Sequence, residues 1–522
     1  MKKRAIAIKE QTDNPSINIA LDTIGKNKQA LIFANTKSSA EKTAEDISLK
    51  IQQADAKLEK LSYDILNVLS RPTKQCTRLA MCVKKGIAFH HAGLAAKQRE
   101  MIEDAFREGA IKVICSTPTL AAGLDLPAFR TVLKDLKRFG YHGLSYIPVL
   151  EYLQMAGRAG RPKWDTFGEA ICVAKSDAEK DELWEQYVMG EPEPIYSKLA
   201  VEPVLRTYLL SLIVANVVRK KEQIMAFFEK TFWAFQYKDM QRLEAIIEKM
   251  LHLLEEWEFV KISGSSDGFR SADEASDYTV KPTLLGQRVA ELYIDPLTAN
   301  FLITCLRKAG GKQPELFSLL QMVSHTLEMR PLLRVKVKEY DEINEKLVEN
   351  EGILIDSEPA MFDEDYDDFL SSIKTALFMH EWCDEKDEEY LLEKFSIRPG
   401  EIKVKLDLAD WLLYSSSEMC RILQFQPLLK EIAKARLRLQ YGVKEELLPL
   451  LKLKNIGRVR ARKLFSNRIR TLGDVKDADL MVLVQILGKA VALDVKKQVG
   501  QDIEKAKVPE GKRKGQISLG DY

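Results

Sequence analysis

The sequence predicts a multidomain fold in which a parallel α/β domain is followed by mainly helical domains. At 522 residues the chain is too long for one hydrophobic core, so three to five domains are expected. Up to about residue 180, apolar strand-like segments alternate with helical segments, a pattern typical of a parallel sheet. Beyond that point amphipathic helical patterns dominate.

The α/β part is predicted from short apolar runs that end in polar turns. Buried strands are expected within 28–36, 86–93, 111–115 and 168–174. Helices are expected over 38–50, with Ser38 or Ser39 near the N-cap, and over 95–108. Because ligands bind at the carboxyl edge of a parallel sheet, functional residues are expected in the loops that follow these strands.

The rest of the chain divides by pattern. Residues 203–259 read as long helices. A strand pair joined by a loose Gly/Ser-rich turn follows, and this combination predicts a winged helix. Residues 293–445 read as all helical, and small helices around tight glycine turns follow. The predicted domains are 1–180, 181–292, 293–445, 446–510 and a disordered tail over 511–522.

Composition excludes several classes of protein. No apolar run reaches 18 residues, and the basic N-terminus lacks a continuous apolar stretch, so neither a membrane span nor a secretory signal is expected. The seven cysteines form no CxxC pair, which predicts no metal site and a reducing, cytoplasmic compartment. Net charge is only +2, yet residues 451–522 carry 17 Lys/Arg against 8 Asp/Glu, which indicates a polyanion partner.

Residues 154–162, Gln-Met-Ala-Gly-Arg-Ala-Gly-Arg-Pro, predict a phosphate-binding segment. Arg158 and Arg161 are three apart, and each follows a glycine that lets the backbone approach a ligand. Two guanidiniums at this spacing can lie on one face of a helical turn and converge on a phosphate. Residues 116–127 add hydroxyls after a strand, which can bind a phosphate backbone, although a polar loop is the alternative when this segment is taken alone.

Four ordered segments resemble motifs of superfamily two helicases. Residues 33–36 resemble motif IV, 90–94 with Arg99 motif IVa, 117–126 motif V and 154–161 motif VI. Their order and spacing are similar to the second RecA-like domain of Ski-type helicases. The downstream helical domains are similar to those of the archaeal Hel-type DNA repair helicases, kin to the helicase part of polymerase theta. The resemblance covers nearly the whole chain.

The resemblance implies roles for individual residues at a site for ATP and Mg²⁺. Arg158 and Arg161 would be arginine fingers, which stabilise the charge of a phosphoryl-transfer transition state and are worth roughly 10³–10⁵ in rate. Gln154 would sense the nucleotide, with Gly157 beside it, while Gly123 and Asp125 would couple ATP to DNA. The residues implied near the DNA backbone are Asn35, Thr36, His91 and Thr117. For His91, a packed loop histidine is the alternative.

Residues 134–148 alternate around two glycines and predict a β-hairpin. In the family a hairpin at this place wedges between the duplex strands. Phe139, Tyr141 or Tyr146 would then stack on the last base pair, because stacking on bases is sequence-tolerant. The alternative is an edge hairpin with surface aromatics.

Pro399 and Glu401 mark the start of a predicted helix. The resemblance implies that this helix belongs to a helical ratchet domain, in which Trp411 stacks on a base of single-stranded DNA. Val404 stands where the family has an arginine, and Lys403 or Lys405 is the candidate substitute. The alternative for Trp411 is a place in the core.

Residues 453–465 resemble a helix-hairpin-helix motif. The turn at Gly457 can offer N–H groups to a DNA phosphate, and Arg458, Arg460 and Arg462 add sequence-independent affinity. The tail resembles a sliding-clamp-binding (PCNA) box through Gln516, Leu519 and Tyr522, a segment that would fold on binding.

The sequence contains neither a G-x-x-x-x-G-K-[ST] loop nor an Asp-Glu-x-His strand end. In the family these belong to the first RecA-like domain. The chain is therefore expected to be a C-terminal fragment, or one subunit of a split 3′–5′ DNA helicase of replication forks and repair, without ATPase activity alone. The alternatives are a non-catalytic DNA-binding module tethered to a clamp and an RNA helicase of the same superfamily.

Overall fold

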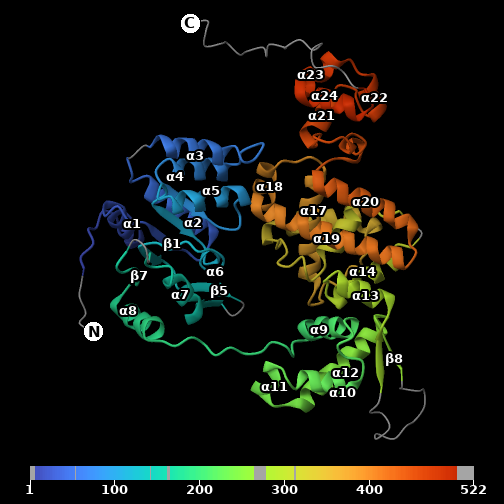
Figure 1. Cartoon of the computed structure of the whole chain (residues 1–522), viewed down its shortest axis with the longest axis horizontal. Helices are drawn as coiled ribbons and strands as arrows, with labels where there is room; N and C mark the ends of the chain where they lie inside the picture. The colour runs from blue at the N-terminus through green and yellow to red at the C-terminus, as the bar shows by residue number, and fades with distance from the viewer. Residues whose placement is uncertain are drawn as a thin grey trace. The chain divides into compact units, whose positions relative to one another are not determined.

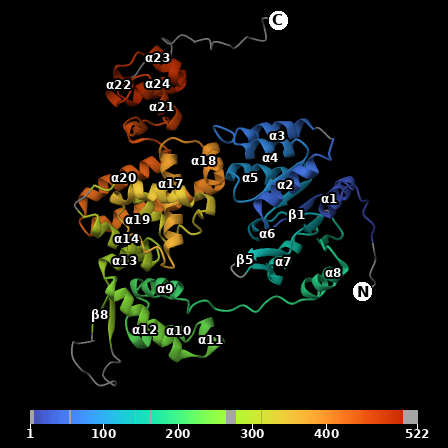
Figure 2. The same ribbon diagram turned by 180° about the vertical axis from the view of Figure 1, so that it is seen from behind.

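The computed structural model describes residues 6–52, 55–140, 143–161, 165–263, 278–310 and 313–501. Contacts between residues divide the chain into two units. Unit 1 contains residues 1–195 and 387–404, and unit 2 contains 196–386 and 405–522. Figures 1 and 2 show the elements of both units from opposite sides.

Unit 1 is built on a five-stranded parallel sheet in the order β2-β3-β1-β4-β7. The strands are β1 (Ala30–Phe33), β2 (Ile87–His90), β3 (Val113–Ser116), β4 (Arg130–Leu133) and β7 (Glu169–Cys172). The four predicted strands are confirmed, and so is their parallel pairing. The sequence analysis missed β4, because this strand begins with the polar pair Arg130 and Thr131.

Helices of unit 1 precede, connect and follow the strands. They are α1 (Pro15–Gly25), α2 (Lys37–Ser48), α3 (Ala56–Leu66), α4 (Lys74–Val83), α5 (Ala96–Arg107), α6 (Thr119–Gly123), α7 (Val149–Ala156), α8 (Asp177–Leu183) and α18 (Glu388–Phe395). The N-cap of α2 is Thr36, whose side chain accepts from the N–H of Ser39, so the predicted cap at Ser38 or Ser39 is corrected by two or three residues.

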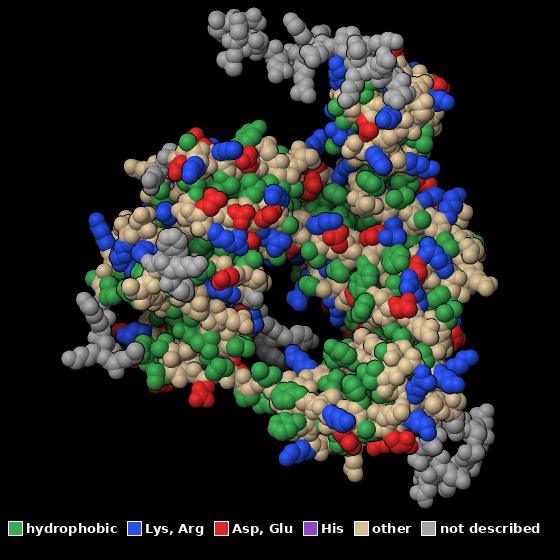
Figure 3. Space-filling model, viewed as in Figure 1, with side chains coloured by type: hydrophobic (Ala, Val, Ile, Leu, Met, Phe, Trp, Pro, Cys, Tyr) green, Lys and Arg blue, Asp and Glu red, His purple; other side chains and the backbone are tan. Residues whose placement is uncertain are grey.

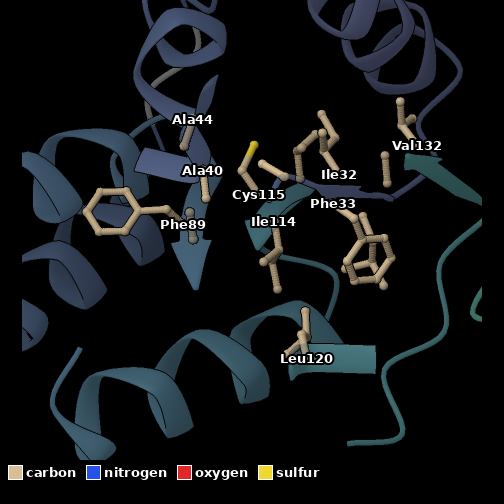
Figure 4. Packing of buried hydrophobic residues seen from close by; sticks show 14 of the residues in the cluster. Ile32, Phe33, Ala40, Ala44, Phe89, Ile114, Cys115, Leu120 and Val132 are labelled. Atoms are coloured by element: carbon tan, nitrogen blue, oxygen red, sulfur yellow. The ribbon is translucent and has the colours of Figure 1, made fainter. Parts of the chain in front are cut away.

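The core of unit 1 lies on both faces of the sheet. Figure 4 shows Ile114 pointing toward Leu120 of α6, while Cys115 points to the opposite face, as alternation along a strand requires. Ala40 and Ala44 of α2 are fully buried in the same cluster.

The chain has seven free cysteines, of which six are buried, and burial raises the pKa of Cys82 to about 12.

Unit 2 begins with helices and an antiparallel strand pair. These elements are α9 (Glu202–Val214), α10 (Lys221–Phe228), α11 (Phe232–Tyr237), α12 (Met240–Glu256), β8 (Val260–Ser263), β9 (Thr279–Pro282) and α13 (Leu284–Glu291). Lys220 forms an isolated bridge with Thr279 of β9. The helices and the strand pair that the sequence predicts here are both present.

The remainder of unit 2 is helical. Its longer helices are α14 (Pro296–Lys308), α15 (Leu316–Ser324), α16 (Tyr340–Asn350), α17 (Tyr366–Cys383), α19 (Pro399–Ile422) and α20 (Gln426–Tyr441). The first six residues of α19 belong to unit 1. The C-terminal helices are α21 (Arg458–Ser466), α22 (Leu472–Asp477), α23 (Leu480–Leu487) and α24 (Lys489–Gln498), which share a separate apolar core.

Within the described part of the chain, no single helix has the length and apolarity needed to cross a membrane. Only α13 and α14 taken together meet that test, and they are bent by 120° where they join.

Candidate functional site

Arg158 joins two loops of unit 1. Helix α7 ends at Ala156, and Arg158 follows in a turn. Its guanidinium Nε and Nη2 atoms donate to the carbonyl oxygen of Ala121, at 3.1 and 2.5 Å. Its Nη1 atom lies 3.4 Å from Oδ1 of Asp125, a side chain that is 92% exposed. The loop of residues 116–127 and the arginine segment therefore meet, as their common role predicts.

Arg161 binds a different set of partners. Its Nε and Nη2 atoms donate to the two carboxylate oxygens of Asp165 at 2.7 and 3.2 Å, and its Nη1 atom donates to Oε1 of Gln29 at 2.8 Å. The prediction that the two arginines share a face of one helical turn is wrong. The helix ends before Arg158, and Gly160 takes a φ of 95°, a value that favours glycine.

Gln154, Gly157, Gly123 and Asp125 all lie at exposed positions of unit 1. Gln154 is in the last turn of α7, and Gly157 caps that helix. An added Cβ atom at Gly123 would meet no heavy atom within 4 Å. These positions are open to a ligand, whereas the Arg161 guanidinium is engaged on three nitrogens.

Three of the residues implied near DNA gather at the carboxyl edge of the sheet. Asn35 and Thr36 follow β1, and Thr117 follows the neighbouring strand β3. The Asn35 side-chain amide donates to the carbonyl oxygen of Lys137. The Thr117 hydroxyl lies 3.0 Å from that of Thr119. The sheet topology thus brings together residues that are up to 82 positions apart.

His91 also follows a strand of the sheet, β2, but its side chain points into the core. Its side chain is fully buried and stacks on the Phe89 ring, with centroids 5.7 Å apart. The Nε2 atom lies 3.0 Å from Oε1 of Glu41, and Nδ1 accepts from the N–H of Gly93. Because both ring nitrogens are occupied, the geometry favours the packed histidine, and His91 is not carried into the interface proposed below.

Glu41 is the centre of a buried polar cluster that the sequence analysis missed. Its carboxylate lies within 2.8–3.2 Å of nitrogen atoms of Gln75, Arg78, His91 and Arg398. Burial opposes its ionisation, but the hydrogen bonds from His91 and Gln75 and the charge of Arg398 outweigh burial and lower its pKa to about 2. The available signal was a glutamate on the apolar face of a predicted helix.

The start of α19 packs tightly on the loop that follows β2. The Gly400 N–H donates to the carbonyl oxygen of Gly93 at 3.0 Å. A Cβ atom at Gly400 would lie 2.3 Å from the oxygen of Ala92 and 2.4 Å from that of Leu94. Glycine is therefore required at residue 400 by close approach of two backbones.

The predicted hairpin is present as β5 (Lys137–Gly140) and β6 (Gly143–Tyr146). Phe139 lies in β5 opposite Leu144, and Tyr141 lies outside the described residues. The Tyr146 hydroxyl donates to Glu182 at 2.8 Å, and Nζ of Lys137 lies 4.2 Å from the centre of its ring. These contacts hold Tyr146 against unit 1, so it is a poor candidate for stacking on DNA.

Two residues of α19 have partners inside unit 2. Trp411 is half-buried, and its indole N–H donates to the carbonyl oxygen of Leu292 at 3.2 Å. Lys405 is buried and donates to the carbonyl oxygens of Met329 and Pro331, so it is not the substitute for the missing arginine. Lys403 is exposed and remains the candidate.

The predicted hairpin turn before α21 is present, with Asn455 at a φ of 65° and Gly457 as the N-cap. A surface depression of about 470 Å³ is lined by Tyr441 and residues 451–457. Arg460 is exposed beside it.

Arg458 and Arg462, in contrast, bind other parts of unit 2. Arg458 lies over the Trp382 ring at 5.0 Å and donates to the carbonyl oxygen of Lys386. Arg462 binds Glu385 with two nitrogens and Glu446 with a third. The expectation that all three arginines serve DNA therefore needs correction, because the charge of Arg462 is already paired.

Gln516, Leu519 and Tyr522 of the clamp-like tail lie outside the described residues. Among the side chains that the structure does describe, no group of three His, Cys, Asp or Glu residues is arranged to hold a metal ion.

Comparison with known proteins adds three family matches. Residues 15–163 match the helicase conserved C-terminal domain, 168–261 a helix-turn-helix domain and 317–442 domain 4 of archaeal helicases. The matches come from both units of the chain.

Three similar curated proteins are each named ATP-dependent DNA helicase Hel308. That of Methanocella arvoryzae is 36% identical over 514 residues, covering 96% of this chain and 66% of the relative. That of Methanococcus vannielii is 35% identical over 507 residues, with 91% and 66% covered. That of Pyrococcus horikoshii is 35% identical over 507 residues, with 96% and 67% covered. The chain spans about two thirds of the length of these relatives.

Proposed function

The chain belongs to the Hel308 family of ATP-dependent DNA helicases, and from that membership we propose that it supplies the second motor domain and the DNA-binding domains of such an enzyme. The observation that carries the proposal is the arginine segment of unit 1. Arg158 and Arg161 both follow the end of α7, and hydrogen bonds anchor each guanidinium. Nothing in a pure DNA-binding module requires two arginines held in this way.

In this proposal the arginine segment completes an ATP site. Arg158 and Arg161 bring positive charge to the γ-phosphate, while Gln154 and Gly157 line its approach. ATP binds with Mg²⁺, whose acidic ligands and P-loop are supplied by a first RecA-like domain, since this sequence has neither motif. That domain resides on a partner chain or on an N-terminal segment of a longer protein.

The surface of α7 suits such a partner domain. Leu150 and Leu153 are 45% and 40% exposed on the helix that carries Gln154. Figure 3 shows hydrophobic side chains gathered over α7. Apolar surface beside a nucleotide-facing helix is what a domain closing over ATP would cover.

The DNA path is proposed along four elements. Asn35, Thr36 and Thr117 contact the backbone at the carboxyl edge of the sheet, with Gly123 and Asp125 linking that edge to ATP. The β5–β6 hairpin, with Phe139 and Tyr141, separates the strands. Lys403 and Trp411 of α19 grip single-stranded DNA. Gly457 and Arg460, with Arg458 at the same helix start, hold a phosphate.

At the level of the whole enzyme, we propose translocation from 3′ to 5′ and action at forks and repair intermediates. The proposed parts remain a second RecA-like domain (1–180), a winged helix (181–292), a helical ratchet domain (293–445) and a helix-hairpin-helix domain (446–510). Gln516, Leu519 and Tyr522 would bind a sliding clamp such as PCNA.

The test is DNA-stimulated ATP hydrolysis by this chain alone and mixed with a chain carrying the P-loop motor domain. We expect hydrolysis only in the mixture, and a loss of about 10³-fold or more with Arg158→Ala or Arg161→Ala. Arg107→Ala is the matched control, because Arg107 is an exposed arginine of α5 paired with Asp104.

The other outcomes identify the alternatives. DNA binding without hydrolysis in the mixture would favour the non-catalytic module. Faster unwinding of duplex RNA than of duplex DNA would favour an RNA helicase. Hydrolysis by this chain alone would contradict the need for a second domain.

A further inference from the structure

The Arg161 guanidinium is held by acceptors at all three of its nitrogens. A guanidinium has five N–H donors, and three of them are used by Asp165 and Gln29. Among the residues that the structure describes, the other two N–H groups meet no acceptor, so they stay available to an incoming anion. Arg161 is 17% exposed, so the group is partly enclosed yet reachable.

Gln29 is fixed so that its oxygen faces the arginine. The residue is 5% exposed, and its Nε2 atom donates to the carbonyl oxygens of Phe106 at 2.6 Å and Ile111 at 2.8 Å. Both amide hydrogens are thereby used, which leaves Oε1 as the atom that accepts from Arg161.

Asp165 is held differently, through its backbone N–H and through a second cation that binds its carboxylate. Its side chain is 1% exposed, and its backbone N–H donates to the carbonyl oxygen of Arg161 at 2.8 Å. Lys28 donates to its Oδ1 atom at 2.6 Å. The hydrogen bond from Arg161 outweighs burial and, with Lys28, lowers the pKa of this carboxyl to about 2. Two cations face one carboxylate, so the cluster keeps a net positive charge.

We propose that Asp165 and Gln29 are positioning residues that aim the Arg161 guanidinium at the γ-phosphate of ATP. The inference rests on the proposed function of Arg161. A finger acts only in the geometry of the transition state, and a displacement of about 1 Å can cost 10²-fold in rate. The Gln29 amide is tied to two backbone carbonyls and the buried Asp165 carboxylate is also bound by Lys28, so together they remove the rotamers that would place the finger elsewhere.

The test uses this chain assembled with the P-loop motor domain. With Asp165→Asn, we expect kcat for DNA-stimulated hydrolysis to fall about 10-fold to 100-fold, while KM for ATP changes less than about twofold. Gln29→Met should act in the same direction. In the Arg161→Ala background, Asp165→Asn should cause no further loss, because the residue acts through the arginine.

Asp22→Asn is the matched control. Asp22 binds the buried Arg130 and Lys26 in the same unit, just as Asp165 binds Arg161 and Lys28. Both variants should lose similar thermal stability, but only Asp165→Asn should lose kcat. Equal kcat losses would reduce Asp165 to a structural residue and overturn the proposal.

Two further results would also overturn it. A rise in kcat with Asp165→Asn would mean that the carboxylate holds Arg161 away from ATP. A wild-type mixture that binds DNA but hydrolyses no ATP would reject the proposed function, and this inference with it, whereas normal wild-type hydrolysis with an unaffected Asp165→Asn variant would reject the inference alone.

Discussion

Glu41 shows how one buried side chain organises distant parts of unit 1. Its partners Gln75, Arg78, His91 and Arg398 come from α4, the loop after β2 and the segment before α19. A carboxylate this deeply buried, with 4% of its side chain exposed, is stable only while its partners remain. The cluster ties α2 to three other segments.

Replacing Glu41 with Gln should destabilise unit 1. Removing one partner of a buried charge cluster leaves the other charges unpaired and costs about 3 kcal/mol. The cost is measured as the free energy of opening of α2 by hydrogen–deuterium exchange. Glu45→Gln is the control, because Glu45 is more exposed and serves Arg78 alone, and it should cost less than about 1 kcal/mol.

The same carboxylate predicts a pH dependence. Its pKa is about 2 in the folded chain against an ordinary 4.5, so folding is favoured by its ionised form. The stability that it contributes is complete above about pH 4.5 and is lost as the pH falls toward 2. The difference in α2 opening energy between wild type and Glu41→Gln should be constant from pH 7 to 5 and shrink below 4.5. A difference unchanged at pH 3 would contradict this assignment.

At the scale of single residues, the sequence patterns identified candidate functional residues better than they identified which residues contact one another. The arginine segment was found because glycines and arginines recur at fixed spacing. The burial of His91 and Lys405 depends on Glu41 and on the carbonyl of Met329, which lie 50 and 76 positions away. No local pattern encodes those pairings.

Among the elements, strands with continuous apolar residues were predicted well. Ala30–Phe33 is buried throughout, and its apolar run needs no tertiary information. The end of α7 at Ala156 was missed, because its C-cap Gly157 keeps a right-handed φ of −65°, and the left-handed Gly160 comes only after the helix has ended.

Gly400 gives a prediction about α19. An alanine inside a helix normally adds up to about 1 kcal/mol of stability over glycine. Here the new Cβ atom would meet two carbonyl oxygens at 2.3 and 2.4 Å, so we expect a net loss of about 1–3 kcal/mol. Faster hydrogen exchange in residues 91–94 and in the first turn of α19 would report it.

Gly25→Ala is the control for that substitution. Gly25 ends α1, is exposed, and has no heavy atom within 4 Å of the added Cβ atom. This variant should gain about 0.5–1 kcal/mol. If Gly400→Ala were also stabilising, the close approach of α19 to the loop would be wrong.

At the scale of the whole molecule, the count of basic residues in the C-terminal segment overstates the positive surface that is available to DNA. The C-terminal segment is strongly basic, yet Arg462 is neutralised by Glu385 and Glu446. The sequence predicted the basic segment correctly but could not show which charges are already paired inside unit 2. Affinity for DNA therefore rests on fewer arginines than the composition suggests.

Arg460 and Arg462 should separate those two roles. Arg460→Ala should weaken binding to single-stranded DNA and reduce the slope of log affinity against log salt by about 1, as loss of one phosphate contact requires. Arg462→Ala should leave that slope unchanged and instead speed hydrogen exchange in α21. Equal changes in slope for both variants would show that Arg462 also reaches DNA.

Because its native cysteines are mostly buried, the chain suits site-specific labelling through a single introduced cysteine. Six of the seven thiols are buried, and burial raises the pKa of the seventh, Cys172, to about 11. Maleimide dyes react with thiolates, which Cys172 rarely forms at neutral pH, and buried thiols are inert to them. A cysteine placed at the exposed Leu144 or Val404 would carry the label almost alone. Fluorescence measurements on this chain would then need no prior removal of its own cysteines.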